Sequence, residues 1–327
     1  AVLKVTRDLA KYVHQDMLVV LESTTYPGTT EEVLMPILTE SGLKVGQNLY
    51  MAFSPERVDP GNHNFKTQNT FKLVGGATKA CLTHAQTFYE QSIVKIFPVS
   101  SPRVAELTKV YENVFRSVNI ALANELAMLC DRMGLNVFEV IDAAATKNFG
   151  FMAFYPGPGV GGHCIPLDPY YLAWKSKEFD MHTRFIELAG EINENMPYFV
   201  VQKLQRLLNR RAKCLNGAKI LVLGVTYKAD VADPRETPAE KVMSLLRHEG
   251  ADLTYCDPHA PTFEVDGQTY KSVPLTAEQL KKCDCALILT AHSDFDMEQI
   301  VKNAPFVFDT RNGAKRAKGA KPNVVVL

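Results

Sequence analysis

The sequence predicts an α/β protein with two parallel-sheet domains that are joined by a long central helix. Short apolar runs alternate with amphipathic segments in residues 1–101, and the same alternation returns in residues 213–327. Between these regions, residues 103–133 contain no Gly or Pro and repeat apolar residues at the helical period. Hydrophobic residues make up 46% of the chain and charged residues 22%, a balance that is typical of globular proteins and excludes a disordered chain.

The first region is expected to form one α/β domain. It opens with Val5, Leu9 and Val13, which are spaced as on one face of a helix. The apolar run MLVVLES and the polar turn after it predict a buried strand that leads into a helix from Thr29 or Thr30. The predicted strands cover 17–23, 49–53, 71–75 and 94–99, and a further helix covers 81–91.

The central region is predicted to be helical. Its longest helix covers residues 102–134, where Gly134 suits the position just after the last turn. The apolar residues of this helix cover more than one narrow stripe, so it can bridge two domains or form a dimer face. Shorter helices are expected at 136–146, 168–178 and 184–210.

The last region repeats strand–helix pairs, which predicts a parallel sheet with helices on its faces. Pro238 suits the first turn of the helix that follows the first strand. The basic tail after Arg311 is expected to be solvated. The predicted strands cover 219–224, 251–258, 285–292 and 306–311, and the predicted helices cover 238–250, 276–283 and 296–303.

Charge and cysteine content narrow the class of function. Lys and Arg number 36, as do Asp and Glu, so the chain lacks the basic excess of a nucleic-acid-binding protein. No apolar run approaches the ~20 residues that a membrane span needs, and the charged N-terminal residues do not resemble a signal peptide. The seven cysteines are an odd number without regular spacing, which argues against a disulfide framework. We therefore expect a cytoplasmic protein that binds neither nucleic acid nor membrane.

The segment YPGPGVGGHCIPLDPYYL, residues 155–172, is the densest chemical signal. Its four glycines surround a single thiol, Cys164, and clustered glycines form loops whose amides can approach a ligand closely. Asp168 and Pro169 suit the N-cap and first position of a helix. A thiol beside a glycine loop and a helix N-terminus is well placed to act as a thiolate nucleophile. The alternative is a flexible loop that contains a small apolar cysteine.

Other candidates are weaker when each is taken alone. Lys109 and Asn113 lie four residues apart on the long helix and share one face, where a Lys can bind an oxyanion or act as a base. Glu56 follows a strand and is a candidate general base for water. The alternative for each is a solvated surface residue.

Three cations follow strands in the last region, where parallel sheets bind ligands: Lys228, Arg235 and Arg311. Such cations suit phosphates, although solvated charges in an ordinary loop would look the same. The spacings Cys256-x-x-His259 and Cys283-x-Cys285 are too sparse for a convincing zinc site, and we expect no metal.

Five segments occur in an order that resembles the UDP-glucose/GDP-mannose dehydrogenase family. They are ESTTYPGTTEE, SPERVDPG, ELTKVYENVFRSVNIALANELA, PGPGVGGHCIPLDPYYL and GVTYKADVADPRETPA. The resemblance implies two Rossmann-like doubly wound domains joined by the long helix, which forms a homodimer or higher homo-oligomer. It implies the remainder of an NAD-binding domain at 1–101, a helical central and dimerisation domain with the Cys loop at 102–212, and a UDP-sugar-binding domain at 213–327.

The resemblance also implies an activity, in which NAD accepts four electrons as the C6 alcohol of a UDP-sugar becomes a carboxylate for surface-polysaccharide precursors. Cys164 would be the nucleophile that carries a thiohemiacetal and then a thioester, and Glu56 would assist the hydrolysing water. The other implied catalytic residues are Lys109, Asn113, Asp168 and Thr24. The implied substrate contacts are Arg57, Gly159, Val160, Gly161, Tyr227, Lys228 and Arg311, and the implied cofactor contacts are Ser23, Thr24, Thr25 and Arg235.

Two residues of the Cys motif indicate a subgroup of substrates. A His before Cys164, and Leu167 where UDP-glucose dehydrogenases usually carry Lys, resemble the branch that acts on UDP-N-acetylhexosamines. UDP-N-acetylglucosamine is therefore the first expected substrate, UDP-N-acetylmannosamine the second and UDP-glucose the third. A non-catalytic UDP-sugar-binding fragment, and a cysteine hydrolase that uses Cys164 and His163, are the alternatives.

One feature of the family is absent from this sequence. The family begins with a strand, a G-x-G-x-x-G turn and a helix that hold the NAD pyrophosphate, and no such motif follows a strand in the first region here. The first domain is thus expected to be N-terminally truncated by roughly 100 residues, by analogy with typical Rossmann size. We therefore expect this chain by itself to bind NAD weakly or not at all.

Overall fold

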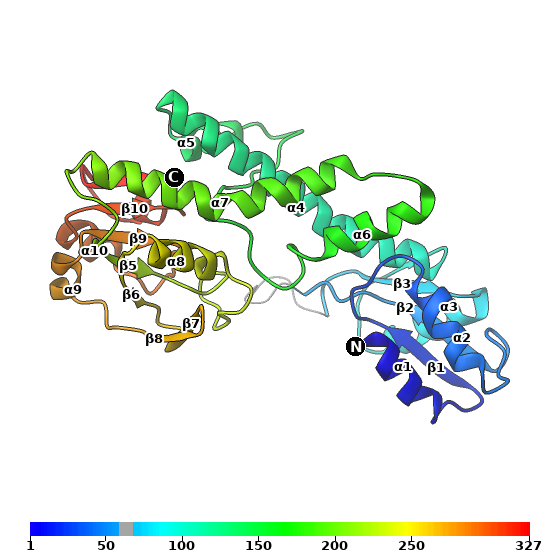
Figure 1. Ribbon diagram of the computed structural model, residues 1–327. Coiled ribbons are helices and arrows are strands. Elements are labelled where there is room, and N and C mark those ends of the chain that lie inside the picture. Colours follow the sequence, from blue (N-terminus) through cyan, green and yellow to red (C-terminus); the bar gives the residue numbers. More distant parts are fainter. Residues whose placement is uncertain (59–67) are drawn as a thin grey trace. The chain divides into compact units, whose positions relative to one another are not determined.

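The computed structural model describes residues 1–58 and 68–327 (Figure 1). The chain divides into two compact units. Unit 1 comprises residues 1–115 and 167–184, and unit 2 comprises residues 116–166 and 185–327. The long helix contributes residues to both units, and each unit has its own sheet and its own core.

Unit 1 contains a four-stranded sheet in the order β1–β2–β3–β4. β1 pairs with β2 in parallel and β3 with β4 in parallel, whereas β2 and β3 are antiparallel. The β2–β3 pair therefore departs from the expected parallel pattern. Consecutive parallel strands need a crossover connection, usually a helix, and the sequence predicts no helix between these two strands. The strands are Met17–Leu21, Leu49–Phe53, Lys72–Gly76 and Ile96–Val99.

Helices cover both faces of this sheet. Leu9, Leu34 and Leu38 pack with Val19 and Met51 on one face. On the other face, Ala85 and Tyr89 of α3 (Lys79–Tyr89) pack with Ala52 and Val74. The first face is covered by α1 (Val2–Ala10), the π-helical turn η1 (Thr29–Leu34) and α2 (Met35–Thr39).

The expected first helix is confirmed, but its predicted face is only partly right. Leu9 and Val13 pack against the core, whereas Val5 is 65% exposed. The helix packs through Val2 and Leu9, and it ends at Ala10, before Val13.

The central helices follow the predicted pattern. α4 covers Pro102–Met133, and Gly134 follows it with φ of +71°, as expected for a residue that ends a helix. The others are α5 (Val137–Ala144), α6 (Asp168–Ser176), the short 3₁₀ turn η2 (Lys177–Phe179) and α7 (Arg184–Asn209). No helix in the described residues is long and apolar enough to cross a membrane.

Unit 2 contains a five-stranded sheet in the order β11–β10–β9–β5–β6, and all its pairs are parallel. The chain adds β6 on one side of β5 and then β9 and β10 on the other, which is the order of a doubly wound sheet. The strands are β5 (Lys219–Leu223), β6 (Asp252–Cys256), β9 (Cys285–Ile288), β10 (Val307–Asp309) and β11 (Val324–Val326).

Both faces of this sheet are covered, as predicted. α7 and α8 (Pro238–His248) pack on one face, where Leu204, Leu208 and Val242 meet Val222 and Phe308. α9 (Ala277–Lys282) and α10 (Met297–Asn303) pack on the other, where Leu280 and Ile300 meet Leu221 and Ile288 (Figure 1). Pro238 begins α8, with the Thr237 hydroxyl accepting a hydrogen bond from the Ala239 amide.

Two segments of unit 2 differ from expectation. The basic tail is not simply solvated, because its end forms β11, which pairs with β10, and Leu327 is buried. Its basic residues precede this last apolar run, VVVL, which completes the sheet edge. An antiparallel hairpin, β7 (Thr262–Val265) with β8 (Gln268–Lys271), also forms beside the sheet.

Candidate functional site

The loop that carries Cys164 is anchored within unit 2 by a chain of buried amides. The Gly157 N–H donates to Asn124 Oδ1 at 3.0 Å, and Asn124 Nδ2 donates to Asn193 Oδ1 at 2.9 Å. Asn193 Nδ2 donates in turn to the Ser117 carbonyl at 3.1 Å. Asn124 is fully buried, so each donor and acceptor in this chain needs its partner. α4 and α7 therefore fix the start of the glycine loop.

The glycines of this loop make room for other parts of unit 2. A Cβ at Gly157 would lie 2.3 Å from Nη1 of Arg311, and one at Gly161 would lie 2.8 Å from the Glu236 carbonyl. Gly159 has φ of +136°, a conformation that side chains rarely allow. The loop thus packs closely on Arg311 and Tyr227, two of the substrate-contact candidates. The predicted approach of its amides to a ligand stays a prediction.

Arg311 follows β10 and lies against Gly157 of the glycine loop, where hydrogen bonds to nearby groups hold it. Its Nε donates to the Leu289 carbonyl at 3.1 Å, and its amide donates to Asp309 at 2.9 Å. Removal from water lowers the pKa of Arg311 to about 10, although the charge of Asp309 opposes this shift. The guanidinium therefore stays a cation at neutral pH, in a place where it is poorly hydrated.

The loop after β5 carries the other predicted contacts of this unit, Tyr227, Lys228 and Arg235. Tyr227 and Lys228 are half-buried, and Arg235 is exposed. Arg235 forms a two-point ion pair with Asp233, through Nε at 2.9 Å and Nη2 at 2.8 Å.

Cys164 differs from most other cysteines in its surroundings. It is exposed, whereas Cys256 and Cys283 are buried, and burial raises the pKa of both of those thiols to about 11. A thiol with so high a pKa is a poor nucleophile at neutral pH. Cys214 is also exposed, but its thiol donates to the Asn216 carbonyl, away from the glycine loop.

A hydrogen-bonded cluster supports the loop after β5. The Asp230 amide donates to His292 Nδ1 at 3.0 Å, so His292 Nε2 carries the proton and donates to Asp257 at 3.0 Å. Asp230, His259 and His292 each offer an atom within 4.8 Å of the others. Because both nitrogens of His292 are engaged, we interpret this cluster as a support for the loop and not as a metal site.

In unit 1, Lys109, Asn113 and Asp168 lie close together. Asn113 Nδ2 donates to Asp168 Oδ2 at 2.6 Å, and both side chains are buried. Burial raises the pKa of Asp168 above its ordinary value, although the Asn113 hydrogen bond and the charge of Lys109 oppose the shift. The predicted capping role of Asp168 is wrong, because Asp168 is the first residue of α6 and Leu167 is its N-cap. The Asp168 carboxylate accepts instead from Asn113.

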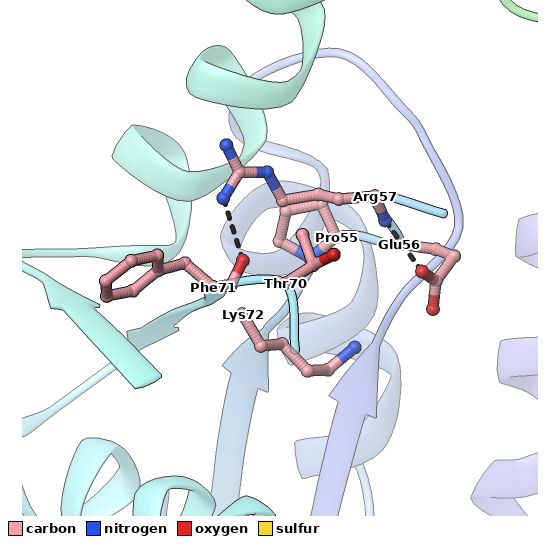
Figure 2. Close-up of a pocket in the computed structure, with 6 residues that line it drawn as sticks. All are labelled: Pro55, Glu56, Arg57, Thr70, Phe71 and Lys72. Carbon is pink, nitrogen blue, oxygen red and sulfur yellow. Dashed lines mark hydrogen bonds between the residues drawn. The ribbon is translucent and has the colours of Figure 1, made fainter. Parts of the chain in front are cut away.

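Glu56 lies just after β2, as predicted, and lines a small recess with Arg57 and Lys72 (Figure 2). Its carboxylate accepts hydrogen bonds from the amides of Arg57 and Val58, both at 2.8 Å. The Arg57 guanidinium bonds to Glu112 of α4 at 2.6 Å and to the Phe71 carbonyl at 2.8 Å. Residues 59–61 of the SPERVDPG motif lie outside the described part of the chain.

The turn Ser23–Thr25 follows the carboxyl end of β1. Ser23 is exposed, Thr24 is half-buried, and Thr25 is buried with its hydroxyl 2.6 Å from that of Thr29. The helical segment that follows has no local side-chain cap, because its N-cap residue is Gly28. Glu106 of α4 supplies the cap, a role that the sequence analysis missed.

Glu106 is fully buried and accepts from the Gly28 amide at 2.5 Å, from the Thr30 amide at 2.9 Å and from the Thr30 hydroxyl at 2.7 Å. The helix dipole also stabilises a negatively charged carboxylate at this N-terminal end. The sequence signal for this cap is slight. Glu106 is a polar residue on the apolar side of the helix, and Asn124 is another.

The predicted site residues thus form two sets within the described structure. In unit 2 the glycine loop with Gly159, Val160, Gly161 and Cys164 is joined with Tyr227 and Arg311. In unit 1, Asp168 is joined with Lys109 and Asn113, and Arg57 is tied to the same helix.

Comparison with protein-family models matches the chain in three segments. Residues 1–93 match the NAD binding domain of the UDP-glucose/GDP-mannose dehydrogenase family, residues 103–195 its central domain and residues 221–316 its UDP binding domain. The first match shows that residues 1–93 belong to the NAD-binding domain of the family.

Relatives agree with these matches. Protein CapL of Staphylococcus aureus is 36% identical over 94% of this chain and 74% of its own length. A UDP-N-acetyl-D-glucosamine 6-dehydrogenase of Pseudomonas aeruginosa is 33% identical over 89% of this chain and 69% of its own length. The solved structure of a UDP-D-ManNAc dehydrogenase from Pyrococcus horikoshii superposes with a TM-score of 0.87 at 31% identity, covering 99% of this chain and 75% of that one.

Proposed function

The chain belongs to the UDP-glucose/GDP-mannose dehydrogenase family of NAD-dependent oxidoreductases, and from this premise we propose that it oxidises C6 of a UDP-N-acetylhexosamine to a carboxylate. UDP-N-acetylglucosamine is the first expected substrate. The observation that carries the proposal is the exposed thiol of Cys164 in a glycine loop that packs on Arg311 and Tyr227 of the UDP-binding unit.

The cations of unit 2 support a diphosphate ligand. Arg311 is charged and poorly hydrated, and Lys228 and Arg235 belong to the loop after β5. Cations at the carboxyl ends of parallel strands bind phosphate oxygens strongly where water is scarce. Arg311 and Lys228 would bind the UDP moiety, and Gly159, Val160 and Gly161 would contact the nucleotide sugar. Arg235 would contact the cofactor.

The family cofactor fits the turn after β1 in unit 1. Ser23 and Thr24 offer exposed and half-buried hydroxyls there, which suit a polar contact to the dinucleotide. The amides of Gly28 and Thr30 already bond to Glu106, so this helix start would not hold the cofactor's phosphates. NAD⁺, when bound, would accept one hydride from C6, so two NAD⁺ in turn would accept the two hydrides that leave this carbon.

Cys164 would keep the half-oxidised sugar attached between the two oxidations. Its thiolate adds to the C6 aldehyde, so a C–S bond forms and the aldehyde oxygen gains a proton to give a thiohemiacetal. Loss of hydride from C6 and of the hydroxyl proton leaves a thioester. Water then breaks the C–S bond, which releases the acid and the thiol.

Unit 1 would supply the groups that stabilise charge during these steps. Lys109 and Asn113 would donate to the oxygen on C6 as it becomes negative, and Asp168 would hold Asn113 in place and exchange protons. Glu56 would assist the water that attacks the thioester, and Thr24 would belong to the same proton network.

UDP-N-acetylmannosamine is a second candidate substrate, and one observation favours it. The superposed Pyrococcus horikoshii structure, with its TM-score of 0.87, is named for that epimer. The two sugars differ only in configuration at C2, away from the reacting carbon.

We also propose that the protein forms a homodimer through α4. Seven large apolar residues on this helix are exposed, and successive residues turn by about 100°, so all seven fall on one stripe. They are Val104, Leu107, Tyr111, Phe115, Leu122, Leu129 and Met133. A stripe of this kind is typical of a helix that packs against a second chain.

The proposed activity is tested by measuring the NADH formed per sugar with the full-length protein. Each UDP-N-acetylhexosamine is supplied in limiting amount with excess NAD⁺. Two NADH per sugar and a uronic acid product are expected with one epimer. One NADH per sugar, or no reaction with either epimer, would contradict the proposal.

A further inference from the structure

A carboxylate of unit 2, Asp233, joins the residue next to Cys164 to the loop after β5. His163 Nε2 lies 3.1 Å from Asp233 Oδ2. The same carboxylate bonds to Arg235 through both of its oxygens. The side chain of Asp233 is 17% exposed, whereas those of His163 and Arg235 are 45% and 72% exposed, so only the carboxylate is largely shielded from water.

Two further contacts hold the same pair of loops together. The Gly162 amide donates to the Glu236 carbonyl at 2.8 Å. Glu236 has φ of +48°, an uncommon conformation for a residue with a side chain, and a backbone in such a state persists only where its surroundings hold it. The rings of His163 and Tyr227 also meet edge to face, with centroids 6.3 Å apart.

The charges at this junction favour the ionised carboxylate. Hydrogen bonds from Arg235 and His163 hold the pKa of Asp233 far below its ordinary value, against the effect of burial. Asp233 therefore remains an acceptor for both partners across the physiological pH range.

We propose that Asp233 and His163 are positioning residues that fix the Cys164 loop to the loop of Tyr227, Lys228 and Arg235. The inference rests on the proposed function, in which that second loop contacts the UDP moiety. A UDP-sugar that contacts the second loop would then affect the thiol through Asp233, because the His163–Asp233 contact joins the two loops. These contacts would hold Cys164 more firmly when a UDP-sugar also binds the second loop.

The test measures the alkylation rate of Cys164, which does not depend on dehydrogenase activity. The protein is treated with iodoacetamide, with and without saturating UDP, and modification of the Cys164 peptide is followed by mass spectrometry. UDP affinity is measured in parallel by calorimetry. The variants are His163→Phe, which keeps the aromatic contact and removes the hydrogen bond, His163→Gln, which keeps a donor, and Asp233→Asn.

We expect UDP to change the alkylation rate of the wild type about tenfold, a size typical of one charge-assisted bond. His163→Phe and Asp233→Asn should abolish most of this change, and His163→Gln should restore part of it. The double variant should be no worse than the more affected single variant, because the two residues act through one contact. His182→Phe, an exposed histidine of unit 1, is the control.

Two outcomes separate the possible failures. If UDP does not bind the wild type, the proposed function fails. If UDP binds and alters Cys164 alkylation equally in the wild type, His163→Phe and Asp233→Asn, the proposed function stands and the positioning role is overturned. A loss of thermal stability alone, with the UDP effect unchanged, would also overturn it.

Discussion

At the scale of single residues, reactivity and stability depend on which polar groups are withdrawn from water. Cys256 and Cys283 are buried and their thiol pKa values are raised, whereas Cys164 is exposed. Glu106 and Asp168 are both buried carboxyls, and burial raises the pKa of each. Each carboxyl has hydrogen-bond partners: Glu106 caps a helix, and Asp168 orients Asn113.

Replacing the predicted nucleophile should separate the two oxidations. With Cys164→Ala, we expect the yield of acid to fall by ~10³-fold or more, because the proposed thiohemiacetal and thioester need the Cys164 sulfur. Aldehyde formation should be less affected. Product analysis of single turnovers checks this, and wild-type turnovers quenched in acid should show a sugar adduct on Cys164. Cys214→Ala, at the other exposed thiol, is the control.

Removing the buried cap should destabilise unit 1. Glu106→Ala leaves two amides and a hydroxyl without their acceptor, and we expect a loss of about 3 kcal/mol in the free energy of unfolding. Glu106→Gln keeps one carbonyl oxygen and should cost less. Chemical denaturation measures both variants, with the exposed Glu125→Ala on the same helix as the control. Equal losses for Glu106→Ala and Glu125→Ala would contradict the capping role.

At the scale of elements, α4 has two roles on different sides. One side provides Glu106, Lys109 and Asn113, each bonded or charged toward residues of unit 1. Asn124, further along the helix, holds the glycine loop of unit 2. Another side carries the exposed apolar stripe, whose members repeat with spacings of three, four and seven residues. Both roles depend on a long helix without a break.

Charging the stripe should separate the proposed dimer. Leu122 and Leu129 are 64% and 52% exposed in the single chain. If a second copy buries them, Leu122→Glu and Leu129→Glu together should convert a dimer to a monomer in light scattering at micromolar concentration. Arg116→Glu, which makes a comparable charge change on a different side of α4, should leave the dimer intact. A monomeric wild type would contradict the proposal.

At the scale of the whole molecule, each unit carries its own sheet, core and set of buried charges. In unit 2, burial disfavours ionisation of Asp257, but bonds from His292, Val225 and His259 outweigh it and lower the pKa of Asp257 below its ordinary value. A carboxyl with a lowered folded-state pKa stabilises the fold at pH above its unfolded value, and this contribution is lost as pH falls through the folded value.

The loss of Asp257 ionisation should therefore weaken unit 2 in acid. We expect the free energy of unfolding to fall below about pH 4 in the wild type. With Asp257→Asn, unfolding at neutral pH should be easier, and the further loss in acid should be smaller. Denaturation at neutral and acidic pH measures the difference, with the exposed Asp252→Asn as the control. An acid response identical to the wild type would contradict this assignment.

The position of most elements could be predicted from the sequence, because helix and strand periods are local properties. Met17–Leu21, Leu49–Phe53 and α4 lie where the apolar patterns predict them. The same reasoning missed the antiparallel β2–β3 pair and the pairing of β11, because strand pairing joins residues that are distant in the sequence. It also assigned Asp168 to the wrong partner, since the nearest helix end is a local choice and Asn113 is 55 positions away.

The sequence by itself determined the family, because the order of five motifs and the glycines around one cysteine do not depend on how the chain packs. It also determined which residue types the chemistry needs. Only the tertiary structure decided that Glu106 caps a distant helix, that Asn124 and Asn193 anchor the glycine loop, and that Asp233 joins His163 to Arg235. These are hydrogen bonds between segments far apart in the chain, and a bond of that kind is fixed by burial and geometry.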